Sequence, residues 1–386
     1  MDFSLSEAQT ELAGLARKIL AERDTPQRQW PELAAAGVLA AGLPESLGGA
    51  GLGFLEECSV LAEIGRAVSP VPYLPSAVLG AGVIASFGNT DQRRRWARPA
   101  GEGSVVLTAA LSDEDGGDPS SPSARAERDG SGWRLSGVKT AVPAAALAGL
   151  LVVPVSAADG VMVFLVEPSD NGVTVQPQTL TGGAGAGRLV LDGVALDDDR
   201  VLGGRRGAEA ADWLASRGTV GLCATQAGTV ARALELTAEY ARSREQFGRP
   251  IGSFQAVAQR LADAYIDVEA VGLTMWQAAW LLAERGPGDA EARAAVATAK
   301  FWAADAGHRV AHTAVHVHGG MGIDTSYPVH RYFTAAKLAE FSLGGATAQL
   351  LRLGEVLATA SGSVGSAAAE FTEPGPPPSA AGEGRS

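Results

Sequence analysis

The stretch YARSREQFGRPIGSFQ, residues 240–255, decides the fold of the second half of the chain. A helix is expected to end near Arg244, and the chain then turns through Gly248 and Pro250. A new helix is expected to begin at Ser253, whose hydroxyl is predicted to cap it. Apolar residues then recur at helical spacing as far as Met275. Long helices joined by so short a turn predict a helical bundle.

The rest of the chain divides by its hydrophobic period. Helical spacing runs through most of 6–100 and returns after 204, whereas a period of two, with Asp-Gly and Asn-Gly turns, prevails from 103 to 204. The pattern predicts an α+β protein with a β module between two helical parts. The predicted units are 1–102, N-terminal helical domain; 103–204, antiparallel β domain; 205–360, helical bundle; and 361–386, a disordered tail rich in Pro and Gly.

Composition excludes several classes of protein. With 46% hydrophobic residues, the 386-residue chain can bury a large core, and its net charge of −12 argues against a nucleic-acid partner. The longest apolar stretch, 141–166, is interrupted by two prolines and an aspartate, so no membrane span is expected. The N-terminus lacks the pattern of a signal peptide. Cys58 and Cys223 lie far apart in apolar surroundings, and a reducing cytoplasm fits best.

The turn itself is a candidate binding element. Arg244 and Phe247 place a guanidinium and an aromatic ring three residues apart at a helix end, which suits a phosphate and a flat ring of a nucleotide cofactor. The alternative is an ordinary helix–helix turn with an exposed Arg and a Phe in the core.

A second motif is HVHGGMGIDTSYPVHRYF, residues 316–333. Its glycines let the backbone approach a ligand closely at the end of a helix. Three histidines share one helical face: His308, His312 and His316. Histidines at this spacing can chelate a metal, but we predict no metal site because neither a cysteine cluster nor an H-E-x-x-H pattern accompanies them.

These two motifs, with the opening MDFSLSEAQ and the loop GLPESLGGAGLG at 42–53, resemble the acyl-CoA dehydrogenase family over about residues 1–360. The resemblance implies an N-terminal helical domain, a middle antiparallel β domain and a C-terminal four-helix bundle. It also implies FAD as cofactor, and assembly into dimers or dimers of dimers.

The resemblance further implies that each FAD lies across a subunit interface. One subunit then holds the flavin ring and the acyl-CoA, and its neighbour holds the adenosine diphosphate half. The residues of this chain that match the neighbour's contribution are Arg244, Gln246, Phe247, Gln255, His316, Gly319 and Gly320. His316 stands where Gln is usual and can still donate a hydrogen bond.

The flavin-ring half departs from the family pattern. The Thr-Glu-Pro-x-x-Gly-Ser-Asp loop appears as LTAALSDEDGGDPSS, 107–121, in which Thr108 is retained but the Glu-Pro and the Gly-Ser-Asp are not. The Trp-Ile-Thr strand beside the flavin reads KTAVPAA, with Ala141 and Pro143 in place of Trp and Thr. Alanine removes the stacking surface and proline removes an amide donor.

The family's catalytic base is also missing from its expected positions. Family chemistry removes an α-proton with a carboxylate while a hydride leaves to the flavin. In RYFTAAKLAEFSLGGATAQL, 331–350, the register puts that base at Leu343 or Gly344, and Glu340 comes three residues too early. Some members instead carry the acid before an Arg on the first bundle helix, where this chain has Ser216, with Asp212 and Glu209 upstream. We therefore predict no catalytic residue in this chain.

The pattern is closest to the non-catalytic subunit of the heteromeric (α2β2) acyl-CoA dehydrogenases that act on steroid side-chain CoA thioesters in actinobacteria. A second acyl-CoA dehydrogenase subunit is expected to hold the isoalloxazine and most of the substrate in a heterotetramer, with electron-transferring flavoprotein as acceptor. The runner-up is a conventional homotetramer whose base is Glu340 or Asp212. A third alternative, a scaffold without FAD, conflicts with the retained REQFG and HGG segments, which nothing but a cofactor requires.

Overall fold

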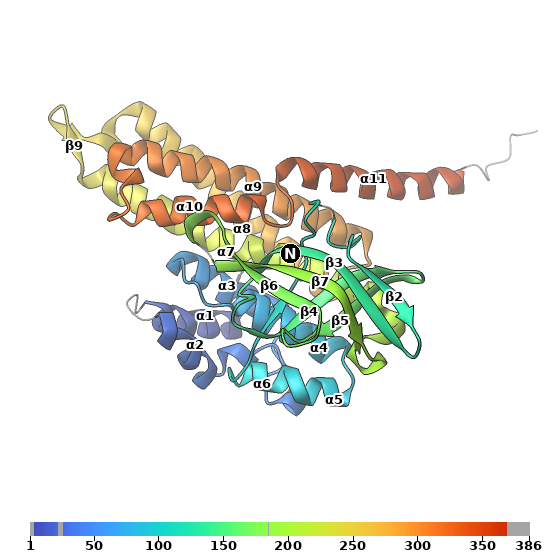
Figure 1. Ribbon diagram of the computed structural model, residues 1–386. Coiled ribbons are helices and arrows are strands. Elements are labelled where there is room, and N and C mark those ends of the chain that lie inside the picture. Colours follow the sequence, from blue (N-terminus) through green and yellow to red (C-terminus); the bar gives the residue numbers. More distant parts are fainter. Residues whose placement is uncertain (1–3, 22–25, 117, 184, 369–386) are drawn as a thin grey trace, which may run out of the picture.

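The computed structural model describes residues 4–21, 26–116, 118–183 and 185–368. In Figure 1 the N-terminal helices lie at the bottom, the sheet lies to the right, and the long C-terminal helices cross the top. The predicted order of helices, sheet and helices is confirmed.

The N-terminal helices pack around one apolar core with the first part of the bundle. They are α1 (Glu7–Leu20), α2 (Pro26–Ala35), α3 (Phe54–Ala67), α4 (Gly82–Phe87), α5 (Thr90–Gln92) and α6 (Arg98–Gly101), with π-helical segments at Tyr73–Ala81 and Arg93–Ala97. At the start of α1 the Ser6 hydroxyl accepts the Gln9 amide (3.1 Å), and the Gln9 side chain accepts the Ser6 amide (2.7 Å). This reciprocal cap fixes where the first helix begins.

The middle part is a mixed sheet with strand order β6-β7-β3-β2-β4-β5-β8, and β1 pairs with β4. The strands are β1 (Val106–Ala109), β2 (Arg125–Asp129), β3 (Gly132–Pro143), β4 (Ala148–Ala157), β5 (Gly160–Val166), β6 (Val173–Thr179), β7 (Gly185–Leu196) and β8 (Val201–Leu202). The prediction of an antiparallel domain is wrong in one respect, since β4 runs parallel to both β1 and β2. The segments that lead from β1 to β4 (110–147) and from β2 to β4 (130–147) are long enough to join parallel neighbours, which a short hairpin could not do.

The C-terminal part is built from α7 (Gly207–Ser243), α8 (Gln255–Arg285), α9 (Ala290–His318), α10 (Val329–Phe341) and α11 (Ala346–Ala368). The predicted cap at Ser253 is wrong, because Phe254 occupies the cap position and the Ser253 hydroxyl donates to the Pro250 carbonyl. Helix α11 extends past the predicted start of the tail, so 361–368 are helical. The rest of the predicted tail, 369–386, lies outside the described residues. Within the described ranges, no helix is both long and apolar enough to span a membrane.

Helices α3 and α7 approach each other through glycines. A Cβ atom at Gly65 would collide with the Thr225 carbonyl, and one at Gly228 would collide with the Ala62 carbonyl. The Thr229 hydroxyl donates to the Gly65 carbonyl (3.3 Å) across the same contact. The N-terminal helices and the bundle are therefore joined at a backbone-to-backbone contact that tolerates no side chain.

We expect Gly228→Ala to lower the free energy of unfolding by about 2 kcal/mol or more, because the added methyl group must push the two backbones apart. The matched control is Gly14→Ala in α1, where nothing lies within 4 Å of the added methyl group. That control is expected to be neutral or to stabilise the helix by up to about 1 kcal/mol. Urea unfolding of the two variants measures the contrast, and equal effects would contradict this account of the contact.

Candidate cofactor-binding and catalytic positions

The turn after α7 presents an aromatic ring to solvent. Phe247 is 93% exposed and lies between the short strands β9 (Glu245–Gln246) and β10 (Arg249–Pro250), with a positive φ of 54°. Its ring meets that of Phe254 edge-on at 6.2 Å, and the Arg249 guanidinium lies 4.2 Å from the Phe254 ring. A Phe in the core, as an ordinary helix–helix turn would have it, is excluded.

Arg244 follows the last residue of α7 and is exposed. Its backbone holds the turn closed, because its N–H donates to the Tyr240 carbonyl and its carbonyl accepts the Ile251 amide, both at 2.8 Å. Its guanidinium has no ion-pair partner among the described residues. Gln246 and Gln255 are also exposed. The turn thus offers a free cation beside a free aromatic face.

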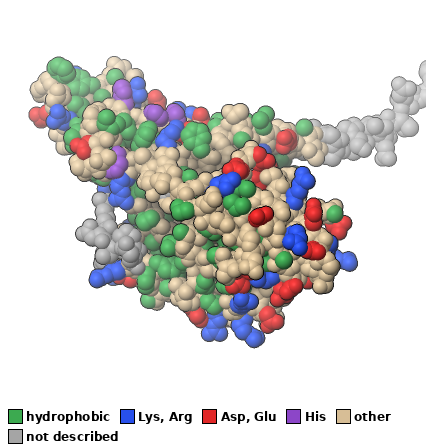
Figure 2. Space-filling view, in the orientation of Figure 1, with side chains coloured by type: hydrophobic (Ala, Val, Ile, Leu, Met, Phe, Trp, Pro, Cys, Tyr) green, Lys and Arg blue, Asp and Glu red, His purple; other side chains and the backbone are tan. Residues whose placement is uncertain are grey.

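The end of α9 lies at the same end of the bundle. The buried His318 ring stacks on Tyr240 of α7, with ring centroids 4.3 Å apart. His316, Gly319 and Gly320 are exposed, and a Cβ on either glycine would have nothing within 4 Å. The structure therefore brings all seven predicted cofactor residues to one end of the bundle, where β9 marks the tip in Figure 1. Histidine and hydrophobic side chains gather over this end in Figure 2.

The histidine face of α9 carries an ion-pair cluster. The rings of His308 and His312 have their centroids 4.2 Å apart. His308 Nδ1 lies 3.2 Å from both carboxylate oxygens of Glu340. In the described part of the chain, no group of three or more His, Cys, Asp or Glu is arranged to hold a metal ion.

The segments that match the flavin-ring half have their polar groups occupied within the chain. Thr108 is fully buried, and its hydroxyl donates to the Pro143 carbonyl (2.6 Å). The Thr140 amide donates to the Ser112 carbonyl (2.9 Å), and the Ala141 amide donates to Gln178 Oε1 (2.8 Å). Since Pro143 has no amide, this edge offers little to a flavin. The residues at the tip of the bundle leave a guanidinium and an aromatic ring free, and so they fit the adenosine diphosphate half of FAD. The segments around β3 fit its flavin ring poorly.

The loop before β2 is held by a buried ion pair. Lys139 Nζ lies 2.8 Å from Asp113 Oδ1, and both side chains are almost wholly buried. Burial lowers the pKa of Lys139, and the hydrogen bond and charge of Asp113 oppose that effect. Asp113 also accepts the Ser123 amide (3.2 Å). The loop that wraps the flavin in the family is thus fastened to β3 in this chain.

The first expected base position is filled by a leucine cluster. A Cβ at Gly218 of α7 would lie 3.1 Å from Leu111, 3.4 Å from Leu343 and 3.5 Å from Leu79, measured to Cδ1 in each case. Leu343 has a positive φ of 55°, and its carbonyl accepts a hydrogen bond from the Gln349 side chain (3.0 Å). An ionised carboxylate would not be stable among these side chains.

The runner-up acid, Glu340, is engaged in ion pairs. Its carboxylate lies 2.6 Å from Lys337 Nζ as well as close to His308, and the side chain is only 14% exposed. Its backbone carbonyl accepts a hydrogen bond from the buried Lys300 (3.1 Å). Asp212, the other runner-up, is exposed near the start of α7.

A carboxylate that the sequence did not reveal lies beside the second base position. Glu57 of α3 is 3.6 Å from Arg217 of α7, and the side chains are 8% and 21% exposed. Burial raises the pKa of Glu57 to about 7, which the charge of Arg217 only partly opposes. The sequence does show an acid on the apolar face of α3, since Glu57 lies between Phe54 and Leu61. Its partner Arg217 is 160 positions away in the chain (217 − 57), so no local pattern reveals the pair.

Helical, sheet and helical parts in this order place the chain in the fold class expected for an acyl-CoA dehydrogenase. Family models match along the chain: acyl-CoA dehydrogenase N-terminal domain at 6–104, middle domain at 108–194 and C-terminal domain at 205–358. The chain belongs to the acyl-CoA dehydrogenase family, whose cofactor is FAD.

Two relatives and two solved structures show which members of the family this chain is similar to. The chain is 47% identical to acyl-CoA dehydrogenase FadE27 of Mycobacterium tuberculosis, over 93% of this chain and 99% of the relative. It is 30% identical to the human mitochondrial short-chain specific acyl-CoA dehydrogenase, over 90% and 85%. Among solved structures it matches a chain of the ChsE4–ChsE5 complex from M. tuberculosis (TM-score 0.87, 47% identity, 93% and 99% coverage). It also matches a variant of the Tcur3481–Tcur3483 steroid ACAD (TM-score 0.86, 41% identity, 93% and 100% coverage).

The raised pKa of Glu57 predicts a pH-dependent stability. A carboxyl whose pKa is higher in the folded than in the unfolded chain binds more protons when folded, so stability falls as pH rises from about 4.5 to about 7. Between pH 5 and pH 7.5 we expect the wild-type chain to lose about 2 kcal/mol relative to Glu57→Gln. Urea unfolding at the two pH values measures this difference, and a constant difference would contradict it.

Proposed function

We propose that this chain is the non-catalytic subunit of a heteromeric FAD-dependent acyl-CoA dehydrogenase. Its end-of-bundle residues, the seven named above, complete the FAD site of a partner chain that bears the base and holds most of the acyl-CoA. When bound, FAD supplies the hydride acceptor for α,β-desaturation of the thioester. The likeness to a steroid ACAD complex favours a steroid side-chain CoA as substrate, with electron-transferring flavoprotein as the electron acceptor.

The observation that carries this proposal is the contrast between the two half-sites. At the tip of the bundle, Arg244 and Phe247 are exposed with nothing in the described chain covering them. At the sheet, the amides of Thr140 and Ala141 are bonded within the chain. A group that remains free at the surface is available to a cofactor, and a group already satisfied is not.

The length of α7 separates the leucine-filled base position from the exposed turn at the tip of the bundle. Gly218, beside the leucine-filled base position, and Arg244, beyond the end of the helix, are roughly 40 Å apart along its axis at the usual rise per residue. A single cofactor reaching both would have to follow most of that helix. The separation supports an arrangement in which the tip of the bundle serves a flavin held by another chain.

The alternative is a conventional homotetramer with Glu340 or Asp212 as base. Glu340 is a partly buried carboxylate, as such a role needs, but it is held by Lys337 and His308. A base must have a lone pair free to reach the substrate. The ion pairs of Glu340 therefore favour the non-catalytic reading.

In the complex with the partner chain, we expect Arg244→Gln and Phe247→Ala each to weaken FAD binding by about tenfold or more, since each removes a contact with the cofactor's phosphate or ring. The matched control for Phe247 is Leu15→Ala, which truncates an exposed apolar residue on α1. FAD retained after gel filtration measures the effect. Full retention by both turn variants would contradict the assignment.

Substitution of Glu340 distinguishes the proposed non-catalytic subunit from the alternative, a homotetramer with its own base. Under the proposal, Glu340→Gln in the complex leaves the desaturation rate within about twofold of wild type, because the base is in the other chain. Under the alternative, loss of the base lowers the rate by about a hundredfold or more. Steady-state dehydrogenation with a dye acceptor measures it, with Asp212→Asn tested in the same way.

A further inference from the structure

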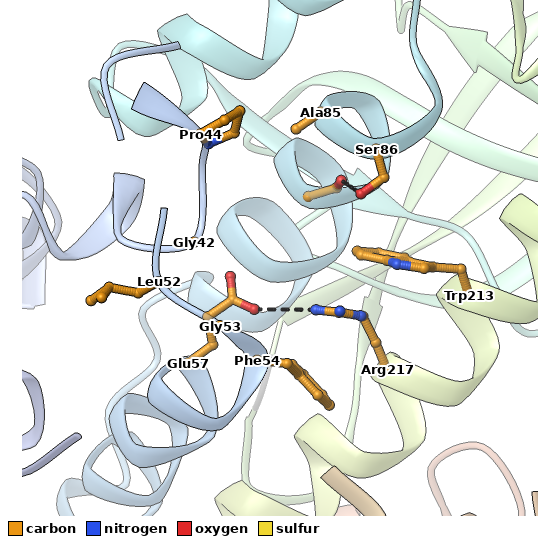
Figure 3. A pocket seen from close by; sticks show the side chains of 11 residues that line it. Gly42, Pro44, Leu52, Gly53, Phe54, Glu57, Ala85, Ser86, Trp213 and Arg217 are labelled. Carbon is orange, nitrogen blue, oxygen red and sulfur yellow. Dashed lines mark hydrogen bonds and ion pairs between the residues drawn. The ribbon is translucent and has the colours of Figure 1, made fainter. Parts of the chain in front are cut away.

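A cavity of about 280 Å³ lies between the N-terminal helices and the start of α7. Figure 3 shows its two charged side chains, Glu57 and Arg217, facing one another, with the rings of Phe54 and Trp213 beside them. The remaining walls are small or apolar residues: Gly42, Pro44, Leu52, Gly53, Gly82, Ala85 and Ser86. Gly42 lies directly against the Glu57 carboxylate, since a Cβ there would collide with Oε1, and Gly82 lies against the Trp213 ring. The absence of side chains at these glycines leaves room for the cavity that both charged groups line.

The guanidinium of Arg217 is held in place but has few hydrogen bonds. Its centre lies 4.5 Å from the ring centroid of Phe54 and 4.5 Å from that of Trp213, so it is fixed between two aromatic rings. Its contact with Glu57, at 3.6 Å, is longer than a charge-assisted hydrogen bond. Within the described residues, neither side chain has a hydrogen bond. A largely buried guanidinium with unused donors is a site for an anion.

The charge on Glu57 is the variable part of this site. The titratable groups close to it are Arg217 on α7, Glu56 and Cys58 on α3, and Tyr73 on the π-helical segment. Burial raises the pKa of both Cys58 and Tyr73 well above their usual values, so both stay neutral near pH 7. Glu57 alone among the buried members changes charge there, and its protonation leaves Arg217 without a counter-ion.

We propose that this cavity binds a small monocarboxylate with a short apolar tail, whose carboxylate pairs with Arg217 and accepts a hydrogen bond from protonated Glu57. A planar carboxylate matches the fork of a guanidinium. The apolar tail would lie against Phe54, Trp213 and Leu52. The volume lies just below the usual range for ligand pockets, which favours a molecule of a few carbon atoms.

The cavity is separate from the positions discussed for FAD and from the leucine-filled base position at Leu343, and it adjoins the second base position because Arg217 directly follows Ser216. Every residue named in its lining comes from the N-terminal helices, the loops between them or α7, and none of these described residues belongs to the sheet. The flavin-half segment at 139–145 is on β3, and the adenosine-half residues are at the other end of α7. The inference therefore does not depend on the proposed subunit role.

The test is calorimetric titration of the full-length chain with hexanoate, with hexanamide and inorganic phosphate as comparisons. Hexanamide has nearly the same size without the charge, and phosphate has charge without an apolar tail. We expect saturable binding of hexanoate at pH 6 that is about tenfold tighter than that of either comparison. Above pH 7 the affinity is expected to fall by about tenfold per pH unit, because binding then requires uptake of one proton by Glu57.

Two variants show whether a loss of hexanoate binding comes from the lost contact or from a misfolded cavity. Arg217→Gln is expected to abolish hexanoate binding. Glu57→Gln keeps a neutral hydrogen-bond donor at the same place, so it is expected to bind hexanoate at pH 6 and pH 8 alike. Retained binding in Glu57→Gln shows that the cavity is intact without the carboxylate.

Several results would overturn the proposal. They are the absence of saturable hexanoate binding, equal binding of hexanamide, unchanged binding in Arg217→Gln, and a wild-type affinity independent of pH. A desaturation rate in the complex that collapses on Glu57→Gln would instead assign this carboxyl to the reaction, and would also overturn it. The subunit proposal is tested separately, by FAD binding in the Arg244 and Phe247 variants. Its failure can therefore be distinguished from a loss of desaturation in Glu57→Gln.

Discussion

The backbone contact between α3 and α7 is the constraint on which the rest of the structure depends. Gly65 and Gly228 lie where any Cβ would strike a carbonyl oxygen of the other helix. Because this contact sets the distance between the two helices, it also places Phe54 and Glu57 of α3 against Arg217 of α7. A buried charge pair at such a boundary gains little from attraction alone, since burial itself opposes the charged forms.

Helix α7 makes this contact in its middle, and its two ends have different surroundings. Near its start, Gly218 lies against three leucines at one of the two positions where the resemblance predicts the catalytic carboxylate. At its end, Tyr240 stacks on His318 and so holds the turn and the end of α9 together. The start of α7 is therefore packed with apolar side chains, whereas the turn beyond its end leaves the Arg244 guanidinium and the Phe247 ring exposed.

Local sequence signals predicted most of the fold. Helical period, the period of two between 103 and 204, and the glycine and proline of the turn at 244–253 sufficed for the order of the parts. Register between strands did not follow from these signals, and so the parallel pairing of β4 was missed. The cap at Ser253 was misplaced by one residue, because its hydroxyl satisfies the preceding turn rather than the helix.

The candidate cofactor site could be predicted in part, because local sequence signals reveal only residues that are close together in the chain. Arg244 and Phe247 are close in sequence, so their spacing revealed a motif, and their exposure agrees with it. Their role in binding FAD stays a prediction. The pair of Glu57 and Arg217 joins two helices that are distant in sequence, so no spacing could reveal it. The leucines around Gly218 likewise meet only in the folded chain.

The measurement that tests the central claim most directly is the FAD content and mass of the purified assembly. The chain would be purified alone and again after co-expression with an acyl-CoA dehydrogenase encoded by a neighbouring gene. A colourless chain alone, and a yellow heterotetramer with one FAD per pair of unlike chains, is the predicted result. A homotetramer of this chain with one FAD per chain would contradict it.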